Sequence, residues 1–189
     1  MIRLVSFSRA WPVLVRAGTA LPIVLLACLA GCGDSSPTTF APSCPRVGIL
    51  PEAADLSLYR PGGGDLTDMV LDGRITSVVG DCRREDPRTL SVTARATIQL
   101  TRGPAARGRL APVPIFFAIT GNGRLLYRQT YNVMAQFAAN SDTLTLTTDK
   151  VTLPGLPIGP GVPGSAYELW IGFLLTPEGI AYNRARLAR

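Results

Sequence analysis

Apolar and polar residues alternate strictly from Leu90 to Thr101, and this alternation decides the fold class. The apolar members are Leu90, Val92, Ala94, Ala96, Ile98 and Leu100. Side chains at every second position of a β-strand share one face, so the segment predicts a strand with one face buried and the other in water. Helical periodicity never extends beyond one or two turns elsewhere, so we predict an all-β protein.

Further strand signals follow along the chain. Val113–Thr120 is mostly apolar, which indicates a buried strand, and Gly121-Asn122-Gly123 predicts the hairpin turn into a long strand over Arg124–Phe137. The remaining segments with strand signals are Val47–Leu50, Leu56–Tyr59, Val70–Val79, Thr143–Leu153 and Ala166–Leu175. Together they predict a single antiparallel β-sandwich of about seven strands, of the immunoglobulin or fibronectin type, with a small β-barrel as the alternative.

The C-terminal segment predicts one short helical turn packed on the sandwich. Thr176 is a capping residue, Pro177 suits the first helical position, and Glu178 places an acid in the first turn. We therefore expect the β-sandwich domain to cover residues 44–183 and a basic tail to cover residues 184–189.

Residues 1–31 have the composition of a secretory signal peptide. Three arginines precede the uncharged apolar run Ala17–Ala30. This run is shorter than the roughly 20 residues that a membrane-spanning helix needs. It leads into Leu29-Ala30-Gly31-Cys32. This tetrapeptide resembles the lipobox of bacterial lipoproteins, in which a peptidase cleaves before a cysteine whose sulfur carries diacylglycerol.

The lipobox resemblance implies roles for four residues. Cys32 would carry the lipid and begin the mature chain, and the signal peptidase would recognise Leu29, Ala30 and Gly31. The following residues are rich in serine, threonine and proline. Such a composition cannot form a core, so we expect residues 32–43 to be a flexible lipidated tether that leads to the membrane.

Two further observations bear on localisation. Position 33 is glycine, whereas an aspartate after the lipidated cysteine retains lipoproteins of enteric bacteria at the inner membrane. Gly33 therefore favours the outer membrane, with the domain facing the periplasm. The segments CPRVGILPEAADLSLYRPGGGDLTDMVLDGRI and GFLLTPEGIAYNR resemble a family of Gram-negative envelope lipoproteins over most of Cys44–Arg184. That family has no assigned activity, so the resemblance implies a location in the cell envelope and no catalytic residue.

Cys44 and Cys82 are the two cysteines that remain once Cys28 leaves with the signal peptide and Cys32 is lipidated. An even pair of cysteines in an oxidising compartment predicts a disulfide between them. The bond would tie the start of the domain to an early strand. It would stabilise the fold by about 3–4 kcal/mol in the chain-entropy model.

Composition excludes several kinds of chemistry. The sequence contains no histidine, which excludes Ser–His and Cys–His catalysis and His-ligated metals within this chain. Six acidic residues between Asp65 and Asp86 could form a calcium site or a glycosidase pair, but the interleaved arginines favour surface ion pairs. We therefore predict no catalytic residue, metal or cofactor. The scattered arginines also argue against nucleic-acid binding.

Prolines recur every third residue in Pro154–Gly164, the period of a polyproline II helix. Such a segment could dock into the groove of a partner, or it could be a stiff crossover that covers a sheet edge. The residues predicted as possible partner contacts are Pro154, Leu156, Pro157, Ile158, Pro160, Val162 and Pro163.

The sequence favours a non-catalytic binding or scaffolding module of an envelope complex. It would be held by the lipid on Cys32, and an envelope protein would bind a strand edge or the Pro154–Gly164 segment. A periplasmic carrier of a small apolar ligand or lipid is the alternative, and a hydrolase that uses the acidic residues of 65–86 is third. A carrier predicts a continuous apolar cavity, a scaffold a filled core with an exposed apolar patch, and a hydrolase two facing carboxylates.

Overall fold

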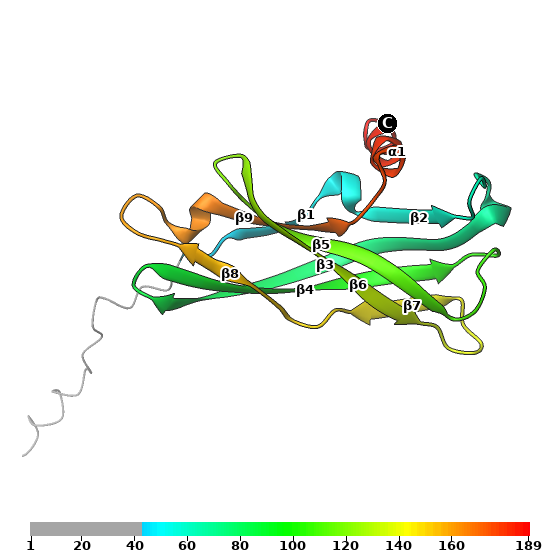
Figure 1. Cartoon of the computed structure of the whole chain (residues 1–189), viewed down its shortest axis with the longest axis horizontal. Coiled ribbons are helices and arrows are strands. Elements are labelled where there is room, and N and C mark those ends of the chain that lie inside the picture. Colours follow the sequence, from blue (N-terminus) through cyan, green and yellow to red (C-terminus); the bar gives the residue numbers. More distant parts are fainter. Residues whose placement is uncertain (1–42) are drawn as a thin grey trace, which may run out of the picture. The chain divides into compact units, whose positions relative to one another are not determined.

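The computed structural model describes residues 43–189, which form two β-sheets packed face to face (Figure 1). The strands are β1 (Arg46–Ile49), β2 (Asp55–Tyr59), β3 (Met69–Asp86), β4 (Thr89–Arg102), β5 (Leu110–Gly121), β6 (Arg124–Gln136), β7 (Thr143–Thr147), β8 (Val151–Pro157) and β9 (Tyr167–Phe173). The helical elements are the 3-10 turns η1 (Pro51–Ala53), η2 (Leu66–Asp68) and η3 (Gly164–Ala166) and the α-helix α1 (Pro177–Leu187). The predicted β-sandwich is therefore confirmed.

The strand order shows how the sandwich is built. One sheet has the order β1-β9-β5-β6, and the other has the order β2-β3-β4-β7, with β8 also paired to β4. Within residues 43–189 the two sheets remain separate and do not close into the alternative barrel. In an immunoglobulin domain the chain crosses to the opposite sheet after its second strand, whereas here β2, β3 and β4 follow one another in one sheet.

Two details differ from the predicted antiparallel sandwich of about seven strands. Residues 43–189 form nine strands, partly because the segment Thr143–Leu153, expected to be one strand, forms two. The break falls at Thr148, whose hydroxyl accepts the N–H of Ala96 and donates to the carbonyl of Asp149. In addition, β1 pairs with β9 in parallel, whereas the other pairs are antiparallel.

The inner faces of both sheets fill the core. The apolar side chains of β4 between Leu90 and Leu100 are at most 2% exposed, as their alternation predicts. From the opposite sheet, Phe117 of β5 and Ile171 of β9 are fully buried. The ring of Phe117 meets that of Tyr131 edge to face, with 5.7 Å between the ring centroids. Such packing leaves the interior between the sheets occupied by side chains.

The β5–β6 hairpin confirms the predicted turn. Asn122 and Gly123 have φ values of +52° and +71°, which are the positive angles that a two-residue hairpin turn requires. The inner face expected for β6 is only partly correct. Ala135 and Phe137 are buried as expected, but Leu125 is 60% exposed. The register shifts at this point, with Ile119 opposite Tyr127 and Thr120 opposite Leu125. One extra residue of β6, Leu126, therefore breaks the alternation of this strand.

The C-terminal helix α1 is longer than the single turn that the sequence predicts. It has eleven residues, and the Thr176 hydroxyl caps it by accepting the N–H of Gly179 at 3.2 Å. Asn183 is buried, and its Nδ2 donates to the carbonyls of Glu52 and Asp55 at 3.0 and 2.8 Å. The helix runs through the expected domain boundary at 183, so most of the basic tail belongs to its last turn.

The predicted disulfide between Cys44 and Cys82 is present, with 5.8 Å between the Cα atoms. Cys44 lies two residues before β1 of one sheet, and Cys82 lies in β3 of the other. The bond therefore links the two sheets at the point where the chain enters the domain.

Candidate functional site

The first half of the proline-rich segment is a strand rather than a free docking helix. Pro154, Leu156 and Pro157 belong to β8, which pairs with β4 so that Leu156 lies opposite Leu90. Leu156 is 5% exposed and belongs to the core. Its assignment as a possible partner contact is therefore wrong, because its side chain points between the sheets.

The second half of the segment forms a hairpin tip that lies beside Ser43, where the chain enters the domain. Gly159 and Val162 exchange backbone hydrogen bonds of 3.1 and 3.0 Å, so Pro160 lies in the turn, and both Val162 and the following Pro163 are exposed. This tip and Ser43 line one shallow surface pocket of about 330 Å³. Ile158, which is half-buried, is anchored because its N–H donates to the Arg88 carbonyl at 2.8 Å. The exposed part of the segment thus lies beside Ser43, the last residue of the predicted tether.

Several of the acidic residues between 65 and 86 have local structural partners. Asp65 caps η2, and the hydroxyl and backbone N–H of Thr67 both donate to it, which lowers the pKa of its carboxyl. Asp68 forms an ion pair with Arg60. Hydrogen bonding from the backbone N–H of Arg88 likewise lowers the pKa of Asp86.

The carboxylates of residues 65–86 are also distributed along the length of one strand. Most of them belong to β3, an extended strand of eighteen residues, so its two ends lie at opposite ends of the sheet. Among residues 43–189, no three His, Cys, Asp or Glu side chains gather where they could hold a metal ion. The acidic residues of 65–86 therefore fall toward both ends of the sheet rather than at one site.

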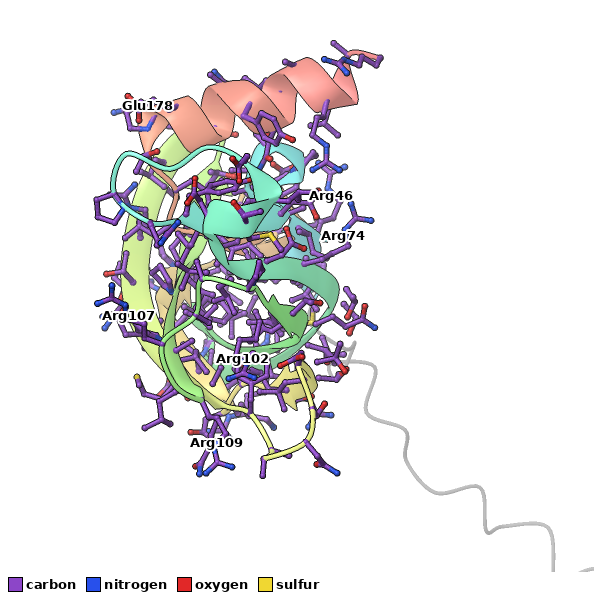
Figure 2. All side chains as sticks on the ribbon, turned by 90° about the vertical axis from the view of Figure 1, so that its right-hand side faces the viewer. Arg46, Arg74, Arg102, Arg107, Arg109 and Glu178 are labelled. Atoms are coloured by element: carbon purple, nitrogen blue, oxygen red, sulfur yellow. A yellow bond between two sulfur atoms is a disulfide. The ribbon has the colours of Figure 1, made fainter. Side chains whose placement is uncertain are left out.

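Three loops form the end of the sandwich that is opposite Cys44, where the chain enters the domain. They span residues 60–68, 103–109 and 137–142 and connect the strand ends that lie farthest from Cys44. Figure 2 looks onto this end, where Arg102, Arg107 and Arg109 are labelled. Loops carried on a rigid β scaffold are common positions for binding residues.

An apolar pocket of about 280 Å³ opens at this end. Its apolar lining includes Leu71 and Phe137, which are buried at 1% and 2% exposure. Its polar lining includes Arg102, Arg107 and Arg109, and no acidic residue contributes to it. We call it the arginine-rimmed pocket. A mostly apolar cavity with a few placed polar groups has the general character of a small-molecule site.

Side-chain hydrogen bonds and a close approach of two backbone segments hold the rim of the arginine-rimmed pocket in place. The Arg102 guanidinium donates to Asp142 Oδ1 at 2.5 Å and to the Gly108 carbonyl at 3.1 Å. Gly103 donates its N–H to the Val70 carbonyl, and a Cβ at this position would lie 2.1 Å from the Met69 carbonyl oxygen. Only glycine permits this close approach of the two backbones, so the loop that carries Arg107 and Arg109 is fixed against β3.

A second surface is the open edge of β6. This strand pairs with β5 along its length and has no partner on its other edge within the part of the chain described. Two apolar side chains of β6, Leu126 and Met134, are 54% and 58% exposed. Long unprotected edge strands are templates for pairing with another chain.

Other sheet edges are protected or short. β8 carries Pro154 and Pro157, which cannot donate to an added strand. β2 has only five residues, and the Asp55 carbonyl on it already accepts a hydrogen bond from Asn183. β6 has thirteen residues and no proline, so it differs from both.

These features define a β-sandwich with a filled core, an open edge strand and one arginine-rimmed surface pocket. The chain matches no family model, no curated protein and no solved structure. Across residues 43–189, no helix combines the length and apolarity that crossing a bilayer requires. The signal peptide, the recognition residues Leu29, Ala30 and Gly31, and the lipidated Cys32 lie outside the described residues, so the lipoprotein resemblance stays a prediction.

Sequence reasoning predicts partner binding at a strand edge without identifying β6, and it does not find the arginine-rimmed pocket. The pattern of residues 102–111 indicates only a loop, although three arginines in eight positions are a visible signal. The pairing that leaves β6 at an edge depends on which strands meet, and local patterns do not report this.

Proposed function

We propose that the protein is a lipid-anchored, non-catalytic binding module of the cell envelope that recruits a protein partner by strand addition at β6. The observation that carries this proposal is the open edge of β6, thirteen residues long and free of proline. In strand addition the main-chain hydrogen bonds supply affinity, and pockets or contacts for alternate side chains supply specificity. Leu126 and Met134 are exposed on β6, so they are the natural specificity contacts.

The filled core supports a binding module over a carrier whose ligand lies between the sheets. The largest buried side chains come from both sheets and belong to one continuous cluster. A carrier of that kind needs a continuous apolar cavity in the same place. The open edge, in contrast, requires no rearrangement before a partner strand adds to it.

The anchor is the second part of the proposal. The eleven residues Gly33–Ser43 reach at most about 35–40 Å when extended, so a lipid on Cys32 would keep the domain close to the membrane. The chain enters the domain beside the Pro160 hairpin tip. We propose that this tip faces the lipid surface, that β6 remains accessible from the periplasm, and that the membrane is the outer one.

Replacing Cys32 by serine is expected to abolish both lipid attachment and signal removal. The lipoprotein peptidase cleaves before a lipidated cysteine, so a Cys32→Ser chain should retain residues 1–31 and carry no acyl group. Intact-mass spectrometry of the chain purified from membranes measures both properties. Cys28→Ser is the matched control and should be processed like the native chain. Cleavage before residue 32 in the Cys32→Ser chain, or an acyl mass that persists in it, would contradict the anchor.

Lysine at the exposed apolar positions of β6 is expected to abolish partner capture. A photo-crosslinking residue at Thr130 should capture one envelope protein in living cells, while the same residue at Thr145 of β7 should not. Leu126→Lys combined with Met134→Lys should lower the captured yield by about tenfold or more, because each substitution replaces an apolar contact with a charge that the interface would have to desolvate.

A matched control separates loss of binding from loss of folding. Val79 of β3 is also 54% exposed, so Val79→Lys introduces the same charge on an exposed apolar position away from β6. This control should leave the captured yield unchanged, and all three substitutions should change the free energy of unfolding by no more than about 0.5 kcal/mol each. Equal capture from Thr130 and Thr145, or loss of capture in Val79→Lys, would overturn the edge assignment.

A further inference from the structure

We infer that the arginine-rimmed pocket binds one acyl chain that ends in a carboxylate, with the chain on the apolar lining and the carboxylate at Arg107 and Arg109. This site is separate from the β6 edge, and the inference does not depend on the proposed strand addition. The charge of the rim, the apolar lining, the fixed shape of the pocket and its volume each support it.

The charge at the rim is uncompensated. Arg102 forms an ion pair with Asp142, so it contributes little net field. Arg107 and Arg109 are exposed, and neither takes part in an ion pair with a described residue. No carboxylate lines the pocket. Guanidinium groups bind carboxylates through paired N–H donors, so an anionic head group complements this rim.

The apolar lining requires an apolar partner. Leu110 at the mouth of the pocket is 63% exposed, and Tyr59 beside it is 37% exposed. They continue the buried surface of Leu71 and Phe137 out to solvent. An alkyl chain packed against these side chains would bury their apolar surface and the surface of its own methylene groups, and both contributions favour binding.

The pocket is held in shape by hydrogen bonds. The N–H of Ala105 donates to the Met69 carbonyl at 2.9 Å, and the N–H of Phe137 donates to the Arg109 carbonyl at 2.8 Å. The loop over residues 103–109 is thus fixed to β3 on one side and to the end of β6 on the other. A preformed site saves the ordering cost that a flexible loop would add to binding.

The volume limits the ligand to one chain. The pocket measures about 280 Å³, near the lower end of the range of roughly 300–1,000 Å³ for small-molecule sites. The neighbouring core is filled, so a chain cannot continue between the sheets. A carboxylate with a single chain therefore matches this volume better than a phospholipid with two chains.

Photolabelling tests the inference on the full-length chain in lipid nanodiscs. The probe is dodecanoate with a diazirine near the end of its chain, and the labelled peptides are mapped by mass spectrometry. We expect the label in the segments around residues 103–112 and 137. Unlabelled carboxylates of eight, ten and twelve carbons should compete, each two-carbon step lowering the half-displacing concentration by about tenfold until the pocket is filled. Dodecylamine should compete much more weakly.

Charge-reversal variants provide the decisive comparison. Arg107→Glu combined with Arg109→Glu should reduce labelling by about tenfold or more. Arg83→Glu combined with Arg95→Glu makes the same charge change at two exposed positions of β3 and β4, away from both the pocket and β6, and should leave labelling unchanged. Leu110→Asp, at an exposed position that folding does not need, should also reduce labelling.

Three outcomes would overturn the inference: labelling away from the pocket, equal competition by dodecylamine, or undiminished labelling in the Arg107 and Arg109 variant. None of these outcomes affects partner capture at β6. A failure of this inference and a failure of the proposed function are therefore distinguishable.

Discussion

Removing the disulfide by Cys44→Ser together with Cys82→Ser is expected to lower the free energy of unfolding by about 4 kcal/mol. The two cysteines are 38 residues apart in sequence, so the bond removes much of the loop-closure freedom of the unfolded chain. The bond also joins Cys44, two residues before β1, to β3 of the opposite sheet. Urea denaturation followed by tryptophan fluorescence measures the loss.

Reduction of the native chain is the matched control for that prediction. A reductant should destabilise the native chain by a similar amount and should not affect the variant that lacks both cysteines. The slope of unfolding free energy against urea should rise in the variant, because an uncrosslinked unfolded chain exposes more surface. A loss below about 1 kcal/mol would contradict the role assigned to the bond and would place β1 outside the cooperative unit.

Phe117→Ala is expected to destabilise the sandwich by about 3–5 kcal/mol. Phe117 is fully buried, and its ring packs edge to face on Tyr131. Alanine would lose the transfer free energy of the ring and leave a cavity that packed strands on both sides cannot close. Thermal and urea unfolding measured together would give the loss and test whether unfolding stays cooperative.

The adjacent residue provides the comparison for Phe117. Phe116 lies next to it on β5, but its side chain is on the other face of the sheet and only partly buried. Phe116→Ala should therefore cost no more than about half as much as Phe117→Ala. Equal losses for the two substitutions would show that the inner face of β5 has been assigned wrongly.

Local patterns in the sequence predict the features that depend on local physics. The alternation of β4, the positive φ angles at Asn122 and Gly123, and the Thr176 cap each follow from a few neighbouring residues. The Cys44–Cys82 bond follows from counting cysteines in an oxidising compartment. The start of α1 is visible for the same reason, but Gly179 and a weak apolar period conceal its length.

Features that depend on strand pairing cannot be predicted in this way. Leu125 fits the alternation of its neighbours in sequence, but the extra residue Leu126 beside it in β6 shifts the register and leaves Leu125 exposed. Leu156 lies among prolines that suggest an exposed helix, yet pairing with β4 buries it. Single-sequence patterns describe how one strand presents its side chains and leave open which strand lies beside it.

The arginine-rimmed pocket escapes prediction for a similar reason. Val70, Phe137 and Arg107 belong to three segments that meet only when β3, β5 and β6 have found their places. Each segment alone has the composition of an ordinary strand or loop. The proline period in Pro154–Gly164 has the opposite effect, because it suggests a binding segment where the structure has a strand. Pro154 and Pro157 lie in β8, where they protect an edge of the sheet.

The parallel pairing of β1 with β9 has a consequence for the time course of folding. The pair Arg46 and Glu168 joins residues 122 positions apart. The first strand, β1, therefore cannot pair until β9, the last strand, has been synthesised. Topologies dominated by such distant pairings fold in about milliseconds to seconds. Until β9 arrives, β5 lacks the neighbour that covers its second edge. The unfinished sandwich, rather than the completed one, is therefore the species with the greatest exposure to aggregation during biosynthesis.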